Sequence, residues 1–175
     1  MKILTKITLS LIILLFTISC KKDDLPKATQ TGSNNMAAKI DGKTWIKTAC
    51  WGCIGAGSGI SIVYNSKGLS IIAEQNDGSK NIIIDLLLLN ISANTNVQLR
   101  ESNGNPSTNS VAEIQDYQSN KFYVTTKNST GTVTINKLDT ANKIISGTFE
   151  FKAENKNDPN DVITVTNGWF DIKHK

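Results

Sequence analysis

Cys50 and Cys53 have the spacing that most resembles a chemical site in this chain. A C-x-x-C pair becomes a redox centre when a helix N-terminus or a nearby cation stabilises one thiolate, usually within a βαβ unit. Here the pair follows a strand-like segment and precedes the glycine-rich residues 55–59, with no helix signal. We therefore rank a structural disulfide first, free thiols second and a redox centre last. The disulfide requires a turn at Gly52, because extended chain would hold the two Cα atoms more than about 7 Å apart.

The remaining residues do not complete a catalytic or metal-binding set. A structural zinc site needs about four ligands, and the domain adds only His174 to the two thiols. Hydrolytic triads usually include a histidine in the middle of the fold, whereas His174 lies next to the C-terminus. We predict no catalytic residue, no metal and no cofactor, and a protein that is not an enzyme.

Cys20 follows an N-terminal segment that is typical of exported chains. Lys2 and Lys6 precede an almost wholly apolar stretch over residues 7–18, and the small Ser19 stands directly before the cysteine. This is the pattern of a cleaved signal peptide, and the apolar stretch is too short to span a hydrocarbon core of ~30 Å. Residues 16–20 resemble a bacterial lipobox, although Thr17 stands where leucine is preferred. The resemblance implies cleavage after residue 19 and stable attachment to membrane lipid through several acyl chains on Cys20. The alternative is an ordinary signal peptide with an incidental cysteine.

Charged and polar residues follow the cysteine. The charged run resembles the sorting signal by which some Gram-negative bacteria send lipoproteins to the cell surface, and it comprises Lys21, Lys22, Asp23 and Asp24. A solvated charge run is the competing interpretation. The polar composition of residues 20–36 predicts a flexible tether between the anchor and the domain. We predict an outer-membrane location in the cell envelope, with display at the surface.

Overall charge limits the classes of partner. Without the two lysines of residues 1–19, the formal net charge falls from +4 to +2. Nucleic-acid binding usually needs a dense basic surface, and the sequence predicts none. An envelope protein or a small ligand remains as a partner of the domain.

From residue 37 onward, alternating apolar and polar residues between turn signals predict strands. Hairpin turns are expected at Asp41-Gly42, at residues 65–68, at residues 139–143 and at Asn167-Gly168. We predict one all-β domain over residues 37–175. Its expected architecture is an antiparallel β-sandwich or flattened β-barrel of about 8–10 strands.

Residues 82–89 are apolar on both faces apart from Asp85. The leucines are compatible with a helix, but the short length and the leading isoleucines favour a strand. Such a strand buries one face in the core, and its other face needs cover. We expect cover by the loop at residues 100–120, and the alternative is a surface for a partner or an apolar ligand.

Two further features carry competing interpretations. Trp45, Trp51 and Trp169 could stack on sugars, but Trp45 and Trp169 lie within strand patterns that favour the core. Asp139-Thr140-Ala141 resembles an O-glycosylation signal of some Gram-negative bacteria, with Thr140 as the acceptor. A plain turn explains the same three residues.

The C-terminal third resembles the ending of a family of small Gram-negative lipoproteins of unknown function. The similarity lies in residues 135–139, in residues 144–151 (IISGTFEF) and in residues 166–172 (TNGWFDI), with residues 40–45 (IDGKTW) as a matching opening. The family implies an all-β fold and an envelope location, and it supplies no active residues. Cys50 and Cys53 have no place in its pattern.

We therefore expect a membrane-anchored, non-catalytic module that binds or supports another envelope component. The alternative is a sandwich or barrel that holds a small apolar ligand or a glycan. A cavity would favour the ligand, whereas an apolar patch around residues 82–89 would favour a protein partner.

Overall fold

The computed structural model describes residues 25–101 and 108–175, and every regular element in these ranges is a β-strand. The strands are β1 (Asn35–Ile40), β2 (Lys43–Ile46), β3 (Ile60–Asn65), β4 (Gly68–Asn76), β5 (Asn81–Leu89), β6 (Thr95–Leu99), β7 (Val111–Asp116), β8 (Lys121–Val124), β9 (Gly131–Asp139), β10 (Ile144–Asn155) and β11 (Asp158–Lys173). They form one antiparallel sheet that does not close, so the predicted all-β fold is confirmed. No helix in the described ranges could cross a membrane.

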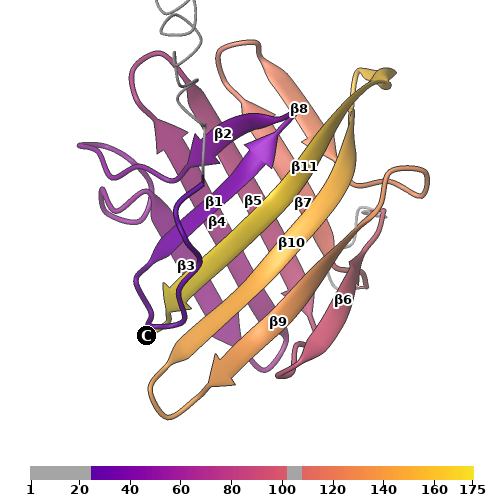
Figure 1. The fold of residues 1–175 in the computed structure, drawn as a ribbon. Coiled ribbons are helices and arrows are strands. Elements are labelled where there is room, and N and C mark those ends of the chain that lie inside the picture. The colour runs from indigo at the N-terminus through magenta and orange to yellow at the C-terminus, as the bar shows by residue number, and fades with distance from the viewer. Residues whose placement is uncertain (1–24, 102–107) are drawn as a thin grey trace, which may run out of the picture.

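The sheet folds into two layers, as Figure 1 shows: β1, β9, β10 and β11 run across the front of β3, β4, β5 and β7. The strand order is β2-β1-β11-β10-β8-β7-β5-β4-β3, and β9 with β6 extends from β10. The long β10 makes this branching possible, because residues 144–151 pair with β9 and residues 154–155 pair with β8. The result is a flattened, open barrel of eleven strands in the described ranges, against the 8–10 that the sequence predicts.

One hydrophobic core fills the space between the layers. Alternate side chains of each strand point inward, as the period of two in a β-strand requires. Trp45 and Phe170 are each 1% exposed, and both belong to the same cluster as Leu69, Ile84 and Leu86. Trp169 is also buried, so the prediction that Trp45 and Trp169 are structural agrees with their burial.

β5 is a strand, as its length and isoleucines predict. Its residues Ile84, Leu86 and Leu88 are buried in the core. The expected cover by residues 100–120 is wrong for the described part of that stretch, because β7 lies there and pairs with the edge of β5. A strand hydrogen-bonded beside β5 extends the sheet and does not lie across the outer face of β5.

The predicted hairpin turn at Asn167-Gly168 is also wrong. These residues lie within the single long strand β11, where the register with β10 shifts between Phe149 and Phe151. Asn167 has a φ of 52°, and a Cβ at Gly168 would collide with the Phe149 ring. Asn167 therefore takes part in a β-bulge, and Gly168 leaves space for an aromatic ring. Because a bulge favours the same residue types as a hairpin turn, the sequence pattern does not distinguish the two.

Part of the expected tether is docked on the domain. The Asp171 carboxylate of β11 accepts hydrogen bonds from Thr29, Thr31, Gly32 and Ser33. Burial opposes ionisation of this wholly buried side chain, but the hydrogen bonds outweigh it and lower its pKa to about 2. We call this contact the Asp171 clasp.

The Asp171 clasp moves the start of the folded domain toward the N-terminus. The sequence predicted a flexible tether to residue 36, whereas residues 29–33 contact β11 and β1 already begins at Asn35. The Asp171 carboxylate fixes residues 29–33 in place by accepting hydrogen bonds from backbone N–H groups among them. Asp171 lies about 140 positions after these residues in the sequence.

Candidate functional site: the open face and its disulfide loop

β3, β4, β5 and β7 form the back layer of Figure 1. Apolar side chains on the outer surface of these strands are partly exposed. Register places Ile72 opposite Asp85, and Asp85 opposite Glu113, so these three strands present them on one side. We call this surface the open face; its members are Val63, Ile72, Ile83, Asp85, Leu87, Leu89 and Glu113. Val63 is 56% exposed, and the others are partly buried. Apolar side chains grouped on one face mark an interaction site more often than scattered exposed residues do.

A shallow groove crosses one end of the open face. Its volume is about 530 Å³, and Val63, Ser70, Leu87 and Leu89 line it together with Lys67. The walls are mainly apolar, and their polar residues include Asn65, Ser70 and Asn90. Such a groove fits an extended segment or a side-chain anchor of a partner.

Asp85 and Glu113 place two carboxylates in the middle of this apolar surface. Oδ1 of Asp85 is buried and has no hydrogen-bond partner in the structure. Burial, and then the neighbouring carboxylate of Glu113, raise the pKa of Asp85 to about 6. A buried carboxylate oxygen without a donor is costly, so the site is electrostatically suited to a cation that would come from outside.

At the other end of the open face, residues 47–59 form a loop closed by a disulfide. The structure joins Cys50 to Cys53 with their Cα atoms 5.2 Å apart. The turn is made by Gly52, whose φ is 86°, and by the hydrogen bond from Cys53 N to Cys50 O. The thiols are therefore bonded to each other, and neither serves as a nucleophile or metal ligand in this state.

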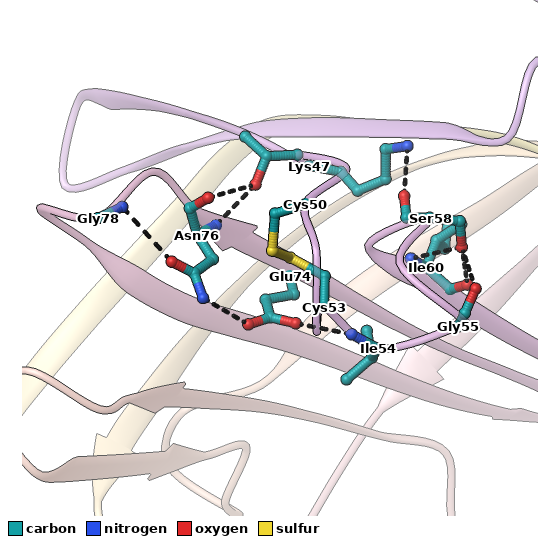
Figure 2. The surroundings of a disulfide bond; sticks show 11 residues. Lys47, Cys50, Cys53, Ile54, Gly55, Ser58, Ile60, Glu74, Asn76 and Gly78 are labelled. Atoms are coloured by element: carbon teal, nitrogen blue, oxygen red, sulfur yellow. Dashed lines mark hydrogen bonds between the residues drawn. A yellow bond between two sulfur atoms is a disulfide. The ribbon is translucent and has the colours of Figure 1, made fainter.

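The loop is fixed to the open face through Glu74 of β4. Figure 2 shows the Glu74 carboxylate between the loop and the strand: Oε2 accepts from Ile54 N at 3.0 Å and Oε1 from Asn76 Nδ2 at 3.3 Å. Thr48 bonds the backbone of Asn76 with its hydroxyl, as acceptor at 2.7 Å and donor at 3.1 Å. These bonds satisfy a buried carboxylate and hold the loop in one position.

Gly59 allows the loop to approach the sheet closely. Its φ is 71°, its carbonyl accepts from Glu74 N, and a Cβ at this position would collide with the carbonyl of Thr48. The glycines at positions 52, 55, 57 and 59 all have positive φ and thus serve backbone geometry.

Trp51 is presented at the tip of this fixed loop. Its side chain is fully exposed, with a relative exposure of 103%, whereas Trp45 and Trp169 are buried. Tryptophan is rarely left wholly in water, because its large ring favours burial. The loop therefore holds in place a side chain suited to contact with another surface.

The other predicted residues lie elsewhere. Cys20 and the charged run at residues 21–24 lie outside the described residues. Thr140 is exposed in the turn between β9 and β10, where Asp139 accepts two hydrogen bonds from Asn142. His174 packs against Tyr64, with 4.8 Å between the ring centroids. Within residues 25–101 and 108–175, no group of three or more His, Cys, Asp or Glu side chains could hold a metal ion.

Sequence reasoning found part of this site. It identified the apolar run at residues 82–89 and the Cys50–Cys53 pair, and it named Trp51 only as a residue that could stack on sugars. It assigned no role to Glu74 or Glu113. A signal existed for Asp85, as the one charged residue of that run. No such signal existed for Glu113, because Glu113 lies next to Asp85 only through the pairing of β5 with β7.

Comparison with known proteins identifies the family. Residues 33–171 match the sequence profile described as Domain of unknown function (DUF6252), and the chain belongs to this family. No curated protein and no solved structure matches the chain.

Proposed function

We propose that this member of the DUF6252 family is an exported lipoprotein, anchored to the outer membrane through acylated Cys20, whose domain binds a protein partner. In this proposal residues 21–24 direct it to the cell surface. The N-terminal pattern of residues 1–20 supports the anchor, and the open face supports the binding role.

One observation carries the binding role. The open face surrounds the unpartnered Oδ1 of Asp85 and the carboxylate of Glu113 with partly exposed apolar side chains. The complementary surface is a protein segment that brings a lysine or arginine among apolar side chains. Such a cation would satisfy the buried oxygen while the apolar groups exclude water.

A ligand-binding barrel receives less support. The groove at the barrel end, lined by Trp45, Ile82, Ile114 and Tyr123 among others, has a volume of about 290 Å³. This lies at the lower limit of sites for drug-sized ligands, which begin near 300 Å³. The large side chains of the core also fill the space between the layers.

Site-specific crosslinking in native membranes tests the proposal. A photoreactive residue at position 87, on the open face, should capture a protein. The same residue at position 148, exposed on the outer side of β10, should not. Replacing Asp85 by Lys should abolish the crosslink, and Asp85→Asn should weaken it, while both variants keep a cooperative thermal transition.

The captured partner allows a stricter test. If a lysine or arginine at the crosslinked site is replaced by glutamate, the partner should lose wild-type binding and regain binding to Asp85→Lys. Equal capture from positions 87 and 148, or capture insensitive to the charge at position 85, would contradict the proposal.

A further inference from the structure

The loop that carries Trp51 has no charged residue between positions 48 and 59. Ala49 and Ala56 are exposed beside the tryptophan, and Ile54 is partly exposed. The disulfide closes this uncharged segment, and the hydrogen bonds to Glu74 hold it against β4. Its composition differs from the polar, charged rim that surrounds most protein interfaces.

The nearest cation in the sequence is turned back into the loop. Lys47 Nζ donates to the carbonyl of Ser58 at 2.9 Å, and desolvation by burial lowers the pKa of this lysine. Figure 2 shows the lysine side chain extended toward Ser58, along the base of the loop. The tip therefore presents an indole ring, small side chains and backbone, without a positive group.

The Asp171 clasp limits how far the domain can stand from its anchor. Thr29 is fixed to Asp171, and nine residue steps join it to Cys20. Nine extended residues span at most about 30 Å. A domain of this size has a diameter of roughly 35–40 Å, so it would lie within its own diameter of the bilayer.

We propose that residues 48–59 make a second contact with the membrane, in which Trp51 lies among the phospholipid headgroups. This inference rests on the proposed anchoring at Cys20. Tryptophan favours the membrane interface because its ring is apolar while its N–H can bond to water or headgroups. The loop lacks cations, so the contact does not depend on anionic lipid. Together with the acyl chains, it gives the domain a fixed orientation on the membrane surface.

Trp51 itself is the probe for the test. The lipidated protein is reconstituted into phosphatidylethanolamine–phosphatidylglycerol vesicles, with either ordinary or brominated acyl chains. Bromine quenches tryptophan emission only at short range, and the side chains of Trp45 and Trp169 are both buried. The difference between wild type and Trp51→Phe therefore isolates the signal of Trp51.

We expect the wild type to lose the Trp51 emission in brominated vesicles, and Trp51→Phe to show no comparable loss. The loss should persist when phosphatidylglycerol is omitted. Both proteins should float with the vesicles, because the acyl chains remain. Equal emission in the two kinds of vesicle, from protein that floats, would overturn the loop contact and leave the anchor standing. In that case a crosslink from position 51 to a protein would reassign the loop to partner binding. Protein that does not float would overturn both.

Discussion

Two aspartates on outward-facing positions of the sheet, Asp171 and Asp85, have opposite environments. Asp171 is wholly buried beneath residues 29–33 and accepts hydrogen bonds from both hydroxyl and backbone donors, which bring its pKa to about 2. Asp85 is partly buried, keeps one oxygen without a donor, and has a pKa of about 6. The same chemical group is thus stabilised as an anion in one layer and destabilised as an anion in the other.

The difference lies in what covers each face. The N-terminal segment brings donors to Asp171 from within the chain, so that side of the front layer is complete. Among the described residues, no segment does the same for Asp85. Each shift corresponds to about 2–3 kcal/mol, stabilising for Asp171 and destabilising for Asp85 at neutral pH. Ionised Asp85 on the open face therefore carries an electrostatic cost that a nearby cation would reduce.

The two carboxylates give stability an opposite dependence on pH. Asp171 has a depressed pKa, so its contribution is present above pH 4 and is lost as pH falls toward 2. Asp85 has a raised pKa, so its cost is absent below about pH 4 and complete above about pH 6. Between pH 4 and 6 the Asp85 effect dominates, and the unbound domain should lose stability as pH rises.

Replacing Asp171 by asparagine should have the largest effect. The substitution places an NH₂ group among N–H and O–H donors, and should lower the free energy of unfolding by about 2–4 kcal/mol. Urea denaturation measures this loss, and faster hydrogen exchange at the amides of residues 31–33 should accompany it. Glu150→Gln, at an exposed site on β10, is the matched control. Unchanged exchange at these amides would show that the clasp does not depend on the charge.

Replacing Asp85 by asparagine should have the opposite sign. It removes a charge that is unfavourable at neutral pH, and should raise the free energy of unfolding at pH 7.5 by about 1–3 kcal/mol. The gain should disappear below pH 4, where wild-type Asp85 is protonated. Denaturation curves from pH 3.5 to 7.5 measure both effects. A variant that keeps the wild-type slope between pH 4 and 6 would assign that slope to another group.

Glu113→Gln should give the smallest effect. The negative charge of Glu113 is the second cause of the raised Asp85 pKa, after burial. Removing that charge should therefore undo less than half of the rise in the Asp85 pKa above its ordinary value. The stability gained at neutral pH should stay below about 1 kcal/mol. Carboxyl ¹³C chemical shifts followed through the titration report the Asp85 pKa directly. A return of that pKa to the ordinary aspartate value would make charge repulsion, rather than burial, the main cause.

The sequence predicted the features that depend on local pattern. Alternation located most strands, the turn at Asp41-Gly42 is present, and the isoleucines of residues 82–89 identified β5 as a strand. It missed β6 and β7, whose apolar residues are few and stand in a polar stretch. It also placed a turn at Asn167-Gly168, because bulges and turns require the same residues.

The role of Asp171 could not be predicted from local pattern for a different reason. Residues 29–33 and Asp171 meet only because β1 pairs with β11, across almost the whole chain. The composition of residues 29–33 is typical of a flexible linker, and the buried carboxylate is what gives their hydroxyl groups and the N–H groups of residues 31–33 a partner in the domain. Pairing between distant strands therefore decided which polar residues became structural.

The pairing of β1 with β11 also constrains the order in which the front layer can form during synthesis. A chain made from its N-terminus presents β1 early, whereas its partner strand and Asp171 follow all the other described strands. The front layer therefore cannot be completed until β11 has been made. The same late strand then docks residues 29–33, so the two events that complete this layer occur together.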